Sequence, residues 1–463
     1  MTIPIAIGLV LQALAVGLIA YRLRGNWLVH VGGIFVATAV VYHGINELLL
    51  WTFPGHAEYR PIVSPEYLDQ FVLWIGLSIG IFAVAYLLSL RTRVGAAPSG
   101  VTDDARVGAG RWLDWRLLLV VTTPLIVLSF AGRGYGRGTV LPSAATTQPN
   151  LATGLTQQFL LTMLVLSSFA MVSRFGRKWL LLVLVAQSLL AAALGERLEI
   201  LVAAGVLLYL LARVGIRIGR RQLIYGTIAL GMASLILTST RAAEGRFSNS
   251  AGGFLRLDHL IAGVRNIGSP QTRNLLVSDL GYRLDGNTFG ALELQALRHG
   301  ARPLGWKPLA DDVGLAIPSF LERAKTSSSL ETRSEKVYAE NHLGIRLPQV
   351  APGVAGDILP TQLGAQMGFW GPWGLLVASA VLGVIFGMTD RWLLSRLTPA
   401  RLLIGLGLLS CVLFYERSWD VYPVTFRGII VLLVIAWALA RWRERRALRA
   451  GSPIRDRDAP ATT

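Results

Sequence analysis

Charged side chains interrupt the apolar sequence at a point where a charge needs a partner. Glu196, Arg197 and Glu199 lie where one apolar run ends and the next begins with almost no loop between them. Two acids and an arginine are costly to hold at this depth unless they face water, a partner or a ligand. A polar turn whose side chains reach the membrane surface is the alternative interpretation. The turn is therefore one candidate for chemistry.

A histidine and a glutamate lie one helical turn apart in the second apolar run. His43 and Glu47 have the i, i+4 spacing that puts side chains on one face of a helix, and Asn46 lies beside them. Such a pair could line a cavity among membrane helices. Trp51 lies four residues after Glu47 and is typical of the membrane interface, so ordinary solvation at a helix end explains the pair equally well.

A long polar segment, residues 241–365, mixes cations with acids and histidines. Cations beside a membrane suit a pyrophosphate, because a planar guanidinium binds its oxygens through two hydrogen bonds. Most of these side chains are expected to be ordinary surface residues. The candidates are Arg241, Arg246, Arg256, Arg273, Arg283, Arg323, Lys325, Arg333, Glu244, Asp258, His259, Glu340, His342 and Asp357.

The composition excludes a water-soluble enzyme and a disordered chain. Of the 463 residues, 53% are hydrophobic and only 15% are charged, and the mean hydropathy is +0.52. The one cysteine, Cys411, lies in an apolar run, so neither a disulfide framework nor a cysteine-ligated metal site can be built. We expect a structural thiol there.

Apolar runs long enough to cross a bilayer dominate the chain, since a helix of about 20 residues spans the hydrocarbon core. The first run lacks the features of a cleaved signal peptide, so we expect a retained helix. The predicted fold class is all-α: a polytopic integral membrane protein with about 11 transmembrane helices and one large external helical loop. The runs begin near Ile3, Trp27, Phe71, Leu117, Phe159, Trp179, Ile200, Leu223, Phe369, Leu402 and Phe426.

Arginines gather in alternate short loops, and such loops resist translocation from the cytoplasm. Their distribution predicts an external N-terminus, a cytoplasmic C-terminus and an external position for residues 241–365. Residues 1–240 then hold the first eight transmembrane helices, and residues 366–440 hold the last three. Residues 441–463 form a basic cytoplasmic tail, which we interpret as an anchor against anionic lipid.

The net charge of +17 therefore reflects topology, and nucleic acid is not an expected partner. The external segment carries 14 Lys/Arg against 12 Asp/Glu and has no zinc, RNA-binding or helix-turn-helix spacing. We expect it to fold as short amphipathic helices on the outer leaflet, with one stripe over residues 254–264. Asn287 should cap a second helix and Pro318 should open a third. The prolines of residues 348–360 predict an extended return to the membrane.

Three stretches of the sequence follow a pattern known from one family. Residues 195–207 form an arginine-bearing turn that opens an apolar helix before the long polar segment. Residues 317–325 combine a proline, aromatic and aliphatic residues and a lysine within that segment. Residues 356–387, with Gly368-Phe369-Trp370-Gly371 among them, lead back into the membrane. In these stretches the chain resembles the O-antigen polymerases and oligosaccharide repeat-unit polymerases of the Wzy type.

A further point of resemblance is the family's arginine followed, after ten intervening residues, by a glycine. Arg241 with Gly252 and Arg333 with Gly344 have this spacing. The resemblance implies a membrane glycosyltransferase, a polysaccharide polymerase of the bacterial plasma membrane. Such an enzyme moves a growing glycan from one polyprenyl-pyrophosphate carrier onto another lipid-linked oligosaccharide repeat unit. The lipid bilayer and chain-length regulator or flippase proteins are the other implied partners, and no cofactor or metal is implied.

Within this resemblance, a few side chains carry the expected chemistry. Arg197 and Arg241 would bind the pyrophosphate. Pyrophosphate is a good leaving group once its negative charge is neutralised, so the reaction needs few other catalytic groups. His342 would act as the general base, with Glu196 and Asp357 as competitors for that role. The residues expected to bind pyrophosphate or glycan are Arg323, Lys325 and Arg333.

Two other functional classes stay open. Another glycosyltransferase for polyprenyl-linked sugars, or an O-antigen ligase, would have the same outline. Metal-dependent members of that class carry paired acids in the first large external loop, where this chain offers Glu58, Glu66 and Asp69 without close pairing. A flippase or transporter for lipid-linked sugars would favour internal repeats and broken helices, and the sequence contains no evident repeat.

Overall fold

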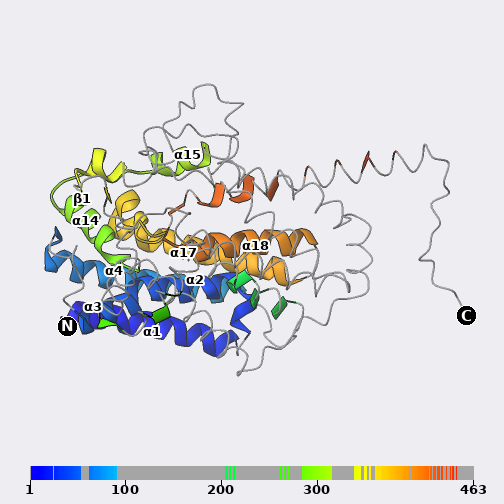
Figure 1. The fold of residues 1–463 in the computed structure, drawn as a ribbon, viewed down its shortest axis with the longest axis horizontal. Coiled ribbons are helices and arrows are strands. Elements are labelled where there is room, and N and C mark those ends of the chain that lie inside the picture. Colours follow the sequence, from blue (N-terminus) through cyan, green and yellow to red (C-terminus); the bar gives the residue numbers. More distant parts are fainter. Residues whose placement is uncertain are drawn as a thin grey trace, which may run out of the picture.

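Four apolar runs form helices that are long and apolar enough to cross a membrane in the computed structural model (Figure 1). These helices are Ile3–Leu23 (α1), Val31–Thr52, Pro65–Leu90 (α4) and Ala365–Ser395 (α17). The described part of the chain is almost entirely helical, as predicted. The structure describes residues 2–23, 26–53, 62–90, 284–314, 338–345, 349–351, 354–355, 360–395 and 399–416, with scattered positions at 204–270 and 418–445.

The other predicted spans are tested only in part. The run near Leu402 forms α18 (Pro399–Leu413), an apolar helix shorter than the four long ones. The count of about 11 spans therefore stays a prediction. The runs near Ile200 and Phe426 are described only at scattered positions, and those outside the described residues begin near Leu117, Phe159, Trp179 and Leu223.

The second span is one apolar helix interrupted by a wide turn. A short 3-10 turn, η1 (Trp27–Val29), precedes α2 (Val31–Val40). The π-helical turn η2 (Val41–Ile45) then leads into α3 (Asn46–Thr52). Single π-turns inside α-helices often occur at functional sites, because they redirect the side chains that follow. Here the turn contains His43 and directly precedes Glu47.

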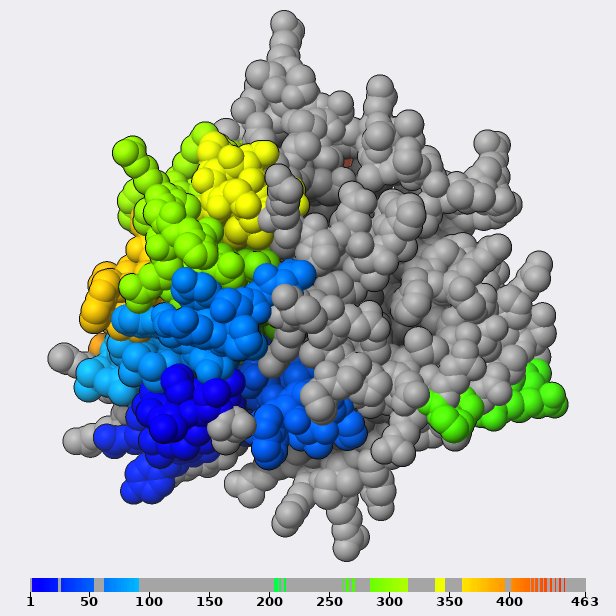
Figure 2. All heavy atoms as spheres, turned by 90° about the vertical axis from the view of Figure 1, so that its left-hand side faces the viewer, coloured from blue at the N-terminus to red at the C-terminus, as the bar shows by residue number. Residues whose placement is uncertain are grey.

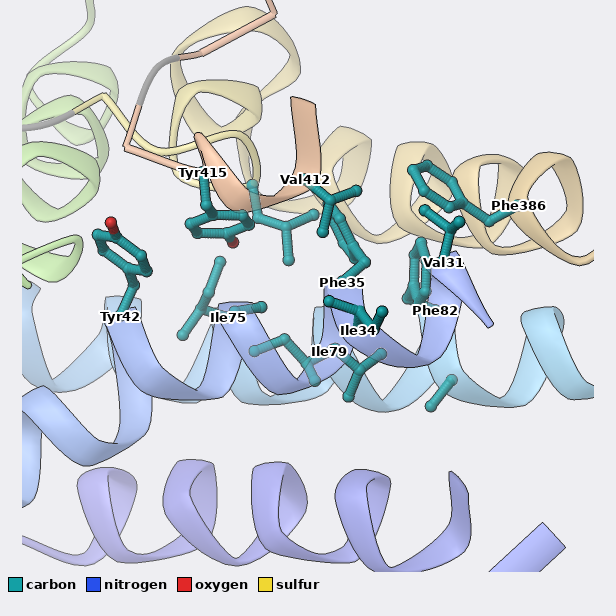
Figure 3. Close-up of a cluster of buried hydrophobic side chains, with 14 of the residues drawn as sticks. Val31, Ile34, Phe35, Tyr42, Ile75, Ile79, Phe82, Phe386, Val412 and Tyr415 are labelled. Atoms are coloured by element: carbon teal, nitrogen blue, oxygen red, sulfur yellow. The ribbon is translucent and has the colours of Figure 1, made fainter. Parts of the chain in front are cut away.

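The long helices pack side by side around α4, which contacts both α1 and α17 (Figure 1). Figure 3 shows the apolar core between them, where Phe35, Phe82 and Phe386 converge from three helices. Ring centroids lie 4.7 Å apart for Phe35 and Phe82 and 5.2 Å apart for Phe35 and Phe386. Tyr42 and Tyr415 pack together at one end of this core, 5.2 Å between centroids.

A buried carboxylate of α17 closes the opposite end of the core. Asp390 accepts hydrogen bonds from the backbone N–H groups of Val31 (3.0 Å) and Gly32 (2.9 Å), the first residues of α2. The hydroxyl of Tyr86 in α4 donates to the same carboxylate at 2.8 Å. Since a helix leaves its first N–H groups without intrahelical partners, Asp390 caps α2 from another helix. Three membrane helices are thereby joined.

α17 bends close to its beginning. Gly371 has φ +71°, a left-handed conformation that favours glycine, and Pro372 follows it. The residues before the bend, Ala365 to Phe369, are buried, whereas Trp373 after it is 74% exposed. The predicted run near Phe369 is thus one kinked helix whose first turn belongs to the protein interior.

Shorter elements lie between the long helices in sequence. They are α14 (Asn287–Arg298), α15 (Lys307–Gly314), the π-turn η6 (Ala339–Leu343) and the strands β1 (Gln349–Ala351) and β2 (Val354–Ala355). The strands pair antiparallel, in agreement with the extended chain predicted from the prolines of residues 348–360. The predicted helix at Asn287 is confirmed, whereas α15 was not predicted. The stripe at 254–264 and the helix at Pro318 lie mostly or wholly outside the described residues.

α14 differs from the surface helix expected at its position. The side chains from Asn287 to Leu294 are buried, and Phe289 and Leu294 have no exposed surface. The helix packs against α4 and α17 at one end of the bundle, as Figure 1 shows. Because eight consecutive side chains are buried, every face of this part of α14 belongs to the core. The expectation that it lies on the outer leaflet is therefore wrong for this helix.

Candidate functional site

Most of the side chains singled out by the sequence cannot be compared with the structure. His342 is the one candidate from the resemblance that falls within the described ranges. The roles of the others stay predictions. The candidates outside the described residues are Glu196, Arg197, Arg241, Arg323, Lys325, Arg333 and Asp357.

His342 lies on the exposed π-turn η6. Its ring stacks on Tyr338, with 5.6 Å between centroids and 21° between planes. Tyr338 in turn donates a hydrogen bond to Asp311 of α15, and the ammonium of Lys307 lies 5.6 Å from the Tyr338 ring centroid. The imidazole is exposed to solvent and is held by stacking, so a substrate could reach it. Its role as a base remains a prediction.

The second sequence candidate, His43 with Glu47, is buried. His43 and Asn46 have no exposed surface and Glu47 is 2% exposed, while Trp51 one turn later is 60% exposed. Solvation at the helix end is therefore excluded as the reason for the pair. The π-turn and the helix after it direct both side chains toward α14.

Asn287 of α14 connects the two side chains of the membrane helix. Its amide Nδ2 donates to the backbone oxygen of His43 at 2.9 Å and to Glu47 Oε2 at 3.1 Å. Its Oδ1 lies 2.8 Å from His43 Nδ1. One amide thus fills three hydrogen-bonding positions, all of them buried.

These contacts decide which nitrogen of His43 carries the proton. The backbone oxygen of His43 can only accept, so the NH2 group of Asn287 must face it, and Oδ1 must face Nδ1. Because Oδ1 can also only accept, Nδ1 is the protonated nitrogen. In the neutral ring Nε2 then holds the lone pair. Asn287 therefore fixes the tautomer as well as the orientation of the imidazole.

Two hydroxyl groups lie at the lone pair of His43. Tyr415, just after α18, places its hydroxyl 3.1 Å from Nε2, and Thr361, just before α17, places Oγ1 at 3.3 Å. Either hydroxyl can donate to the one lone pair of Nε2, and the Thr361 oxygen also accepts the backbone N–H of Gly364. We call His43, Glu47, Asn287, Thr361 and Tyr415 the buried polar cluster. It joins four separate parts of the chain.

The chain before α14 has the residue types needed to seat Asn287. Asp285 caps the helix, because Oδ1 accepts the N–H groups of Asn287 (3.1 Å) and Thr288 (3.0 Å). The sequence assigned the cap to Asn287, which is wrong: its side chain is used by the cluster instead. A Cβ at Gly286 would lie 2.7 Å from Thr361 Cγ2 and 2.9 Å from His43 Cε1, so only glycine allows this approach.

A buried acid of α14 meets the glycine motif at the start of α17. Glu293 has no exposed surface, and its Oε2 accepts the backbone N–H of Gly368 at 3.0 Å. Glu293 lies 75 residues before Gly368 in the chain, so only the packing of α14 against α17 brings the carboxylate to the Gly368-Phe369-Trp370-Gly371 motif.

The side chain of Asn46 has hydrogen-bonding capacity left over. It is completely buried, and neither Nδ2 nor Oδ1 has a partner among the described residues. Most buried polar groups are paired, since an unpaired one costs about 1–3 kcal/mol. Asn46 directly precedes Glu47 and follows Tyr42 by one turn.

Sequence reasoning found His43 and Glu47 but missed their partners Asn287, Thr361 and Tyr415. The run Asp285-Gly286-Asn287-Thr288 was a local signal for a tight, capped helix start, and it was interpreted as a cap alone. No local signal identifies Tyr415, which lies 372 positions from His43. Such partners follow only from the packing of the helices.

Metal chemistry has no visible ligand set in this part of the molecule. Among the described residues, no group of three or more His, Cys, Asp or Glu side chains could hold an ion.

Comparison with known proteins does not assign the chain to a family. No family model, no curated protein and no solved structure matches the chain.

Proposed function

We propose that the chain is a polysaccharide polymerase of the bacterial plasma membrane. It would transfer a glycan from one polyprenyl-pyrophosphate carrier to another lipid-linked oligosaccharide repeat unit at the outer face. The proposal rests on the resemblance to the Wzy type and on the described architecture. It includes an external N-terminus and a cytoplasmic C-terminus, as the arginine distribution predicts.

One observation supports the proposal most. α14 from the polar segment is inserted at one end of the membrane helices, where Asn287 meets His43 and Glu47, and Glu293 meets Gly368. A polar segment attached in this way stays in a fixed position above the lipid phase. A transferase for lipid-linked sugars needs that arrangement, because its substrates carry their reacting groups at the headgroup level.

The proposed reaction forms one bond and breaks another. A hydroxyl oxygen of the acceptor sugar attacks the anomeric carbon of the donor glycan and forms the new glycosidic bond. The bond from that carbon to the pyrophosphate oxygen breaks, and the carrier pyrophosphate leaves with the electron pair. The hydroxyl proton passes to a general base. Arg197 and Arg241 would stabilise the charge on the leaving pyrophosphate, with Arg323, Lys325 and Arg333 binding pyrophosphate or glycan.

The general base of this reaction is assigned to His342. Its imidazole is exposed on η6, as a group that must meet a substrate hydroxyl needs to be. Glu196 and Asp357 stay as competing assignments. His43, in contrast, has both ring nitrogens bonded to protein groups and has no exposed surface. We assign it a positioning role: it holds α14, and with it the segment that carries the catalytic groups.

Deleting the protein from its host and sizing the surface glycan tests the class of function. Loss of a polymerase leaves single repeats on the carrier or on the final acceptor. Unattached polymer of full length would indicate a ligase instead. Repeats retained on the cytoplasmic leaflet would indicate a flippase, and either of these two results contradicts the proposal.

Purified protein with a polyprenyl-pyrophosphate oligosaccharide tests the residues. Arg197→Ala and Arg241→Ala should abolish polymer while the protein stays folded in the membrane. Arg22→Ala is the matched control, because this exposed arginine lies in the last turn of α1, far along the chain from the proposed groups. Polymer of normal length from both variants would refute the pyrophosphate assignment. His342→Ala, compared with Glu196→Gln and Asp357→Asn, identifies the base by the loss of turnover.

A further inference from the structure

Two exposed tryptophans mark the ends of the apolar part of α17. Trp373 is 74% exposed and Trp392 is 42% exposed. A helical rise of 1.5 Å per residue separates the two positions by about 28 Å. The hydrocarbon core is about 30 Å thick, and tryptophan prefers its two edges. Trp373 therefore marks the level at which α17 leaves the hydrocarbon.

Further tryptophans gather at the same level. Trp373 contacts Trp74 of α4 at 5.2 Å between ring centroids. One turn before Trp373, Trp370 contacts Trp306, which directly precedes α15, at 4.4 Å. Trp306 is itself 73% exposed. The chain before α15 is therefore held at the edge of the hydrocarbon next to α17.

Backbone hydrogen bonds fix that part of the chain against α17. The N–H of Leu304 donates to the oxygen of Gly368 at 3.0 Å, and the N–H of Gly305 donates to the oxygen of Phe369 at 2.9 Å. Gly305 has φ +67°, which favours glycine and turns the chain toward Trp306. The exposed position of Trp306 thus belongs to an ordered turn.

Positive side chains gather on the same turn. Arg298, Arg302 and Lys307 are exposed, and no acid occurs between residues 298 and 310. The next acids in the chain are Asp311, which accepts the hydroxyl of Tyr338, and Asp312, which is 3% exposed. Figure 2 shows residues 284–314, in green, bordering the orange residues of α17 on one side of the molecule.

We propose that Arg298, Arg302, Trp306, Lys307 and Trp373 form an interfacial patch that binds the headgroups of anionic phospholipids. The two indole rings lie at the boundary of the hydrocarbon, and the three cations lie where lipid phosphates are found. A guanidinium can bind one phosphate through two hydrogen bonds. Occupancy by such lipids fixes the depth of α14 and of the buried polar cluster in the membrane. The proposal is independent of the transferase activity.

The test measures lipid binding next to the patch. A dye attached through Ala310→Cys, an exposed position of α15, reports the local environment, and the native Cys411 is buried. The protein is placed in bilayers of phosphatidylcholine, and phosphatidylglycerol is then added in steps. The fraction of phosphatidylglycerol that gives half of the full dye response measures the affinity of the patch for this lipid. About 1 M salt, which shortens the screening length to about 3 Å, should weaken the response.

Removing the charges should shift that fraction strongly. Each cation near an anionic surface is worth about a fivefold change in affinity, so the triple variant Arg298→Gln, Arg302→Gln, Lys307→Gln should bind on the order of a hundredfold more weakly. The matched control, Arg298→Lys, Arg302→Lys, Lys307→Arg, keeps the charge and should stay within about threefold. Equal binding by the glutamine variant and the unchanged protein would overturn the proposal.

Two further arms separate the lipid from other ligands. Inorganic pyrophosphate added to pure phosphatidylcholine bilayers should leave the dye unchanged. The same response to pyrophosphate as to phosphatidylglycerol would overturn the assignment to a lipid surface, since it would indicate a site for a free phosphate. A response to a soluble neutral oligosaccharide, retained in the glutamine variant, would likewise overturn it in favour of sugar stacking on Trp306.

Discussion

The two ends of the membrane span Val31–Thr52 are closed in different ways. At its beginning, Asp390 binds Val31 and Gly32, and every partner comes from a long membrane helix. At its other end, His43 and Glu47 are completed by Asn287 of the shorter helix α14. The first end is therefore a property of the helix bundle alone. The second exists only while α14 stays docked, so it depends on a segment that lies outside the long membrane helices.

Asp390→Leu should cause the largest loss of stability. It leaves two buried backbone N–H groups without their acceptor and removes one of two hydrogen-bond partners of the Tyr86 hydroxyl, at about 3–5 kcal/mol together. The free energy of unfolding in bicelles measures the loss. Asp390→Asn keeps one acceptor oxygen and should lose less. A loss below about 1 kcal/mol in the leucine variant would show that the cap contributes little.

Asn287→Leu should come next, with a loss of about 2–4 kcal/mol. The leucine fills the space of the amide but leaves His43 Nδ1 and Glu47 without this partner. The same unfolding measurement applies, with Asn341→Leu on exposed η6 as the control that should change stability by less than about 0.5 kcal/mol. Equal losses in the two variants would contradict the docking described for α14.

Gly286→Ala should follow, because its Cβ would meet Thr361 and His43. Overpacking of this kind costs about 1–3 kcal/mol. Glycan polymer in the host should shorten or disappear in proportion, since α14 is pushed away from the membrane helix. Gly300→Ala is the control: that glycine has φ +95°, but its Cβ would meet no atom within 4 Å, so any loss comes from backbone strain alone. Full polymer length in the Gly286 variant would argue that the docking of α14 is not needed for activity.

His43→Asn should have the smallest effect and separates the two possible roles of this side chain. An asparagine can offer an N–H to Asn287, but its amide oxygen is not basic and cannot take up a proton as the Nε2 lone pair can. If His43 only positions α14, the variant keeps most of the stability, within about 1 kcal/mol, and keeps polymerisation, whereas His43→Ala loses both. A stable His43→Asn protein without turnover would make His43 a general base.

The four described long helices follow from the sequence and the partners in the site do not, for physical reasons. A membrane helix such as α1 or α4 is specified by about 20 consecutive apolar residues, which is local information. The helix that begins at Asn287 is also predictable from local sequence, because of its cap region and the apolar residues after it. In contrast, α15 has eight residues with a proline and two acids, too short and polar to leave a clear pattern.

The partners in the site depend on contacts between distant parts of the chain. His43 and Glu47 were recognised because a charged pair in an apolar run is unusual. Whether they face lipid, water or protein depends on α14, and the amphipathic pattern of α14 suggested a surface helix. The sequence did not single out Glu293, which is buried against Gly368. The local sequence does not distinguish a buried acid from an exposed one, because the difference depends on a partner elsewhere in the chain.

A double-mutant cycle between His43 and Asn287 tests the docking of α14 most directly. The free energy of unfolding is measured in bicelles for His43→Ala, Asn287→Ala and the double variant. Side chains in direct contact should give losses that fail to add, and we predict a coupling of about 1–2 kcal/mol through the bond between Nδ1 and Oδ1. Losses that add within about 0.5 kcal/mol would mean that the two side chains do not meet in the membrane, which would contradict the account.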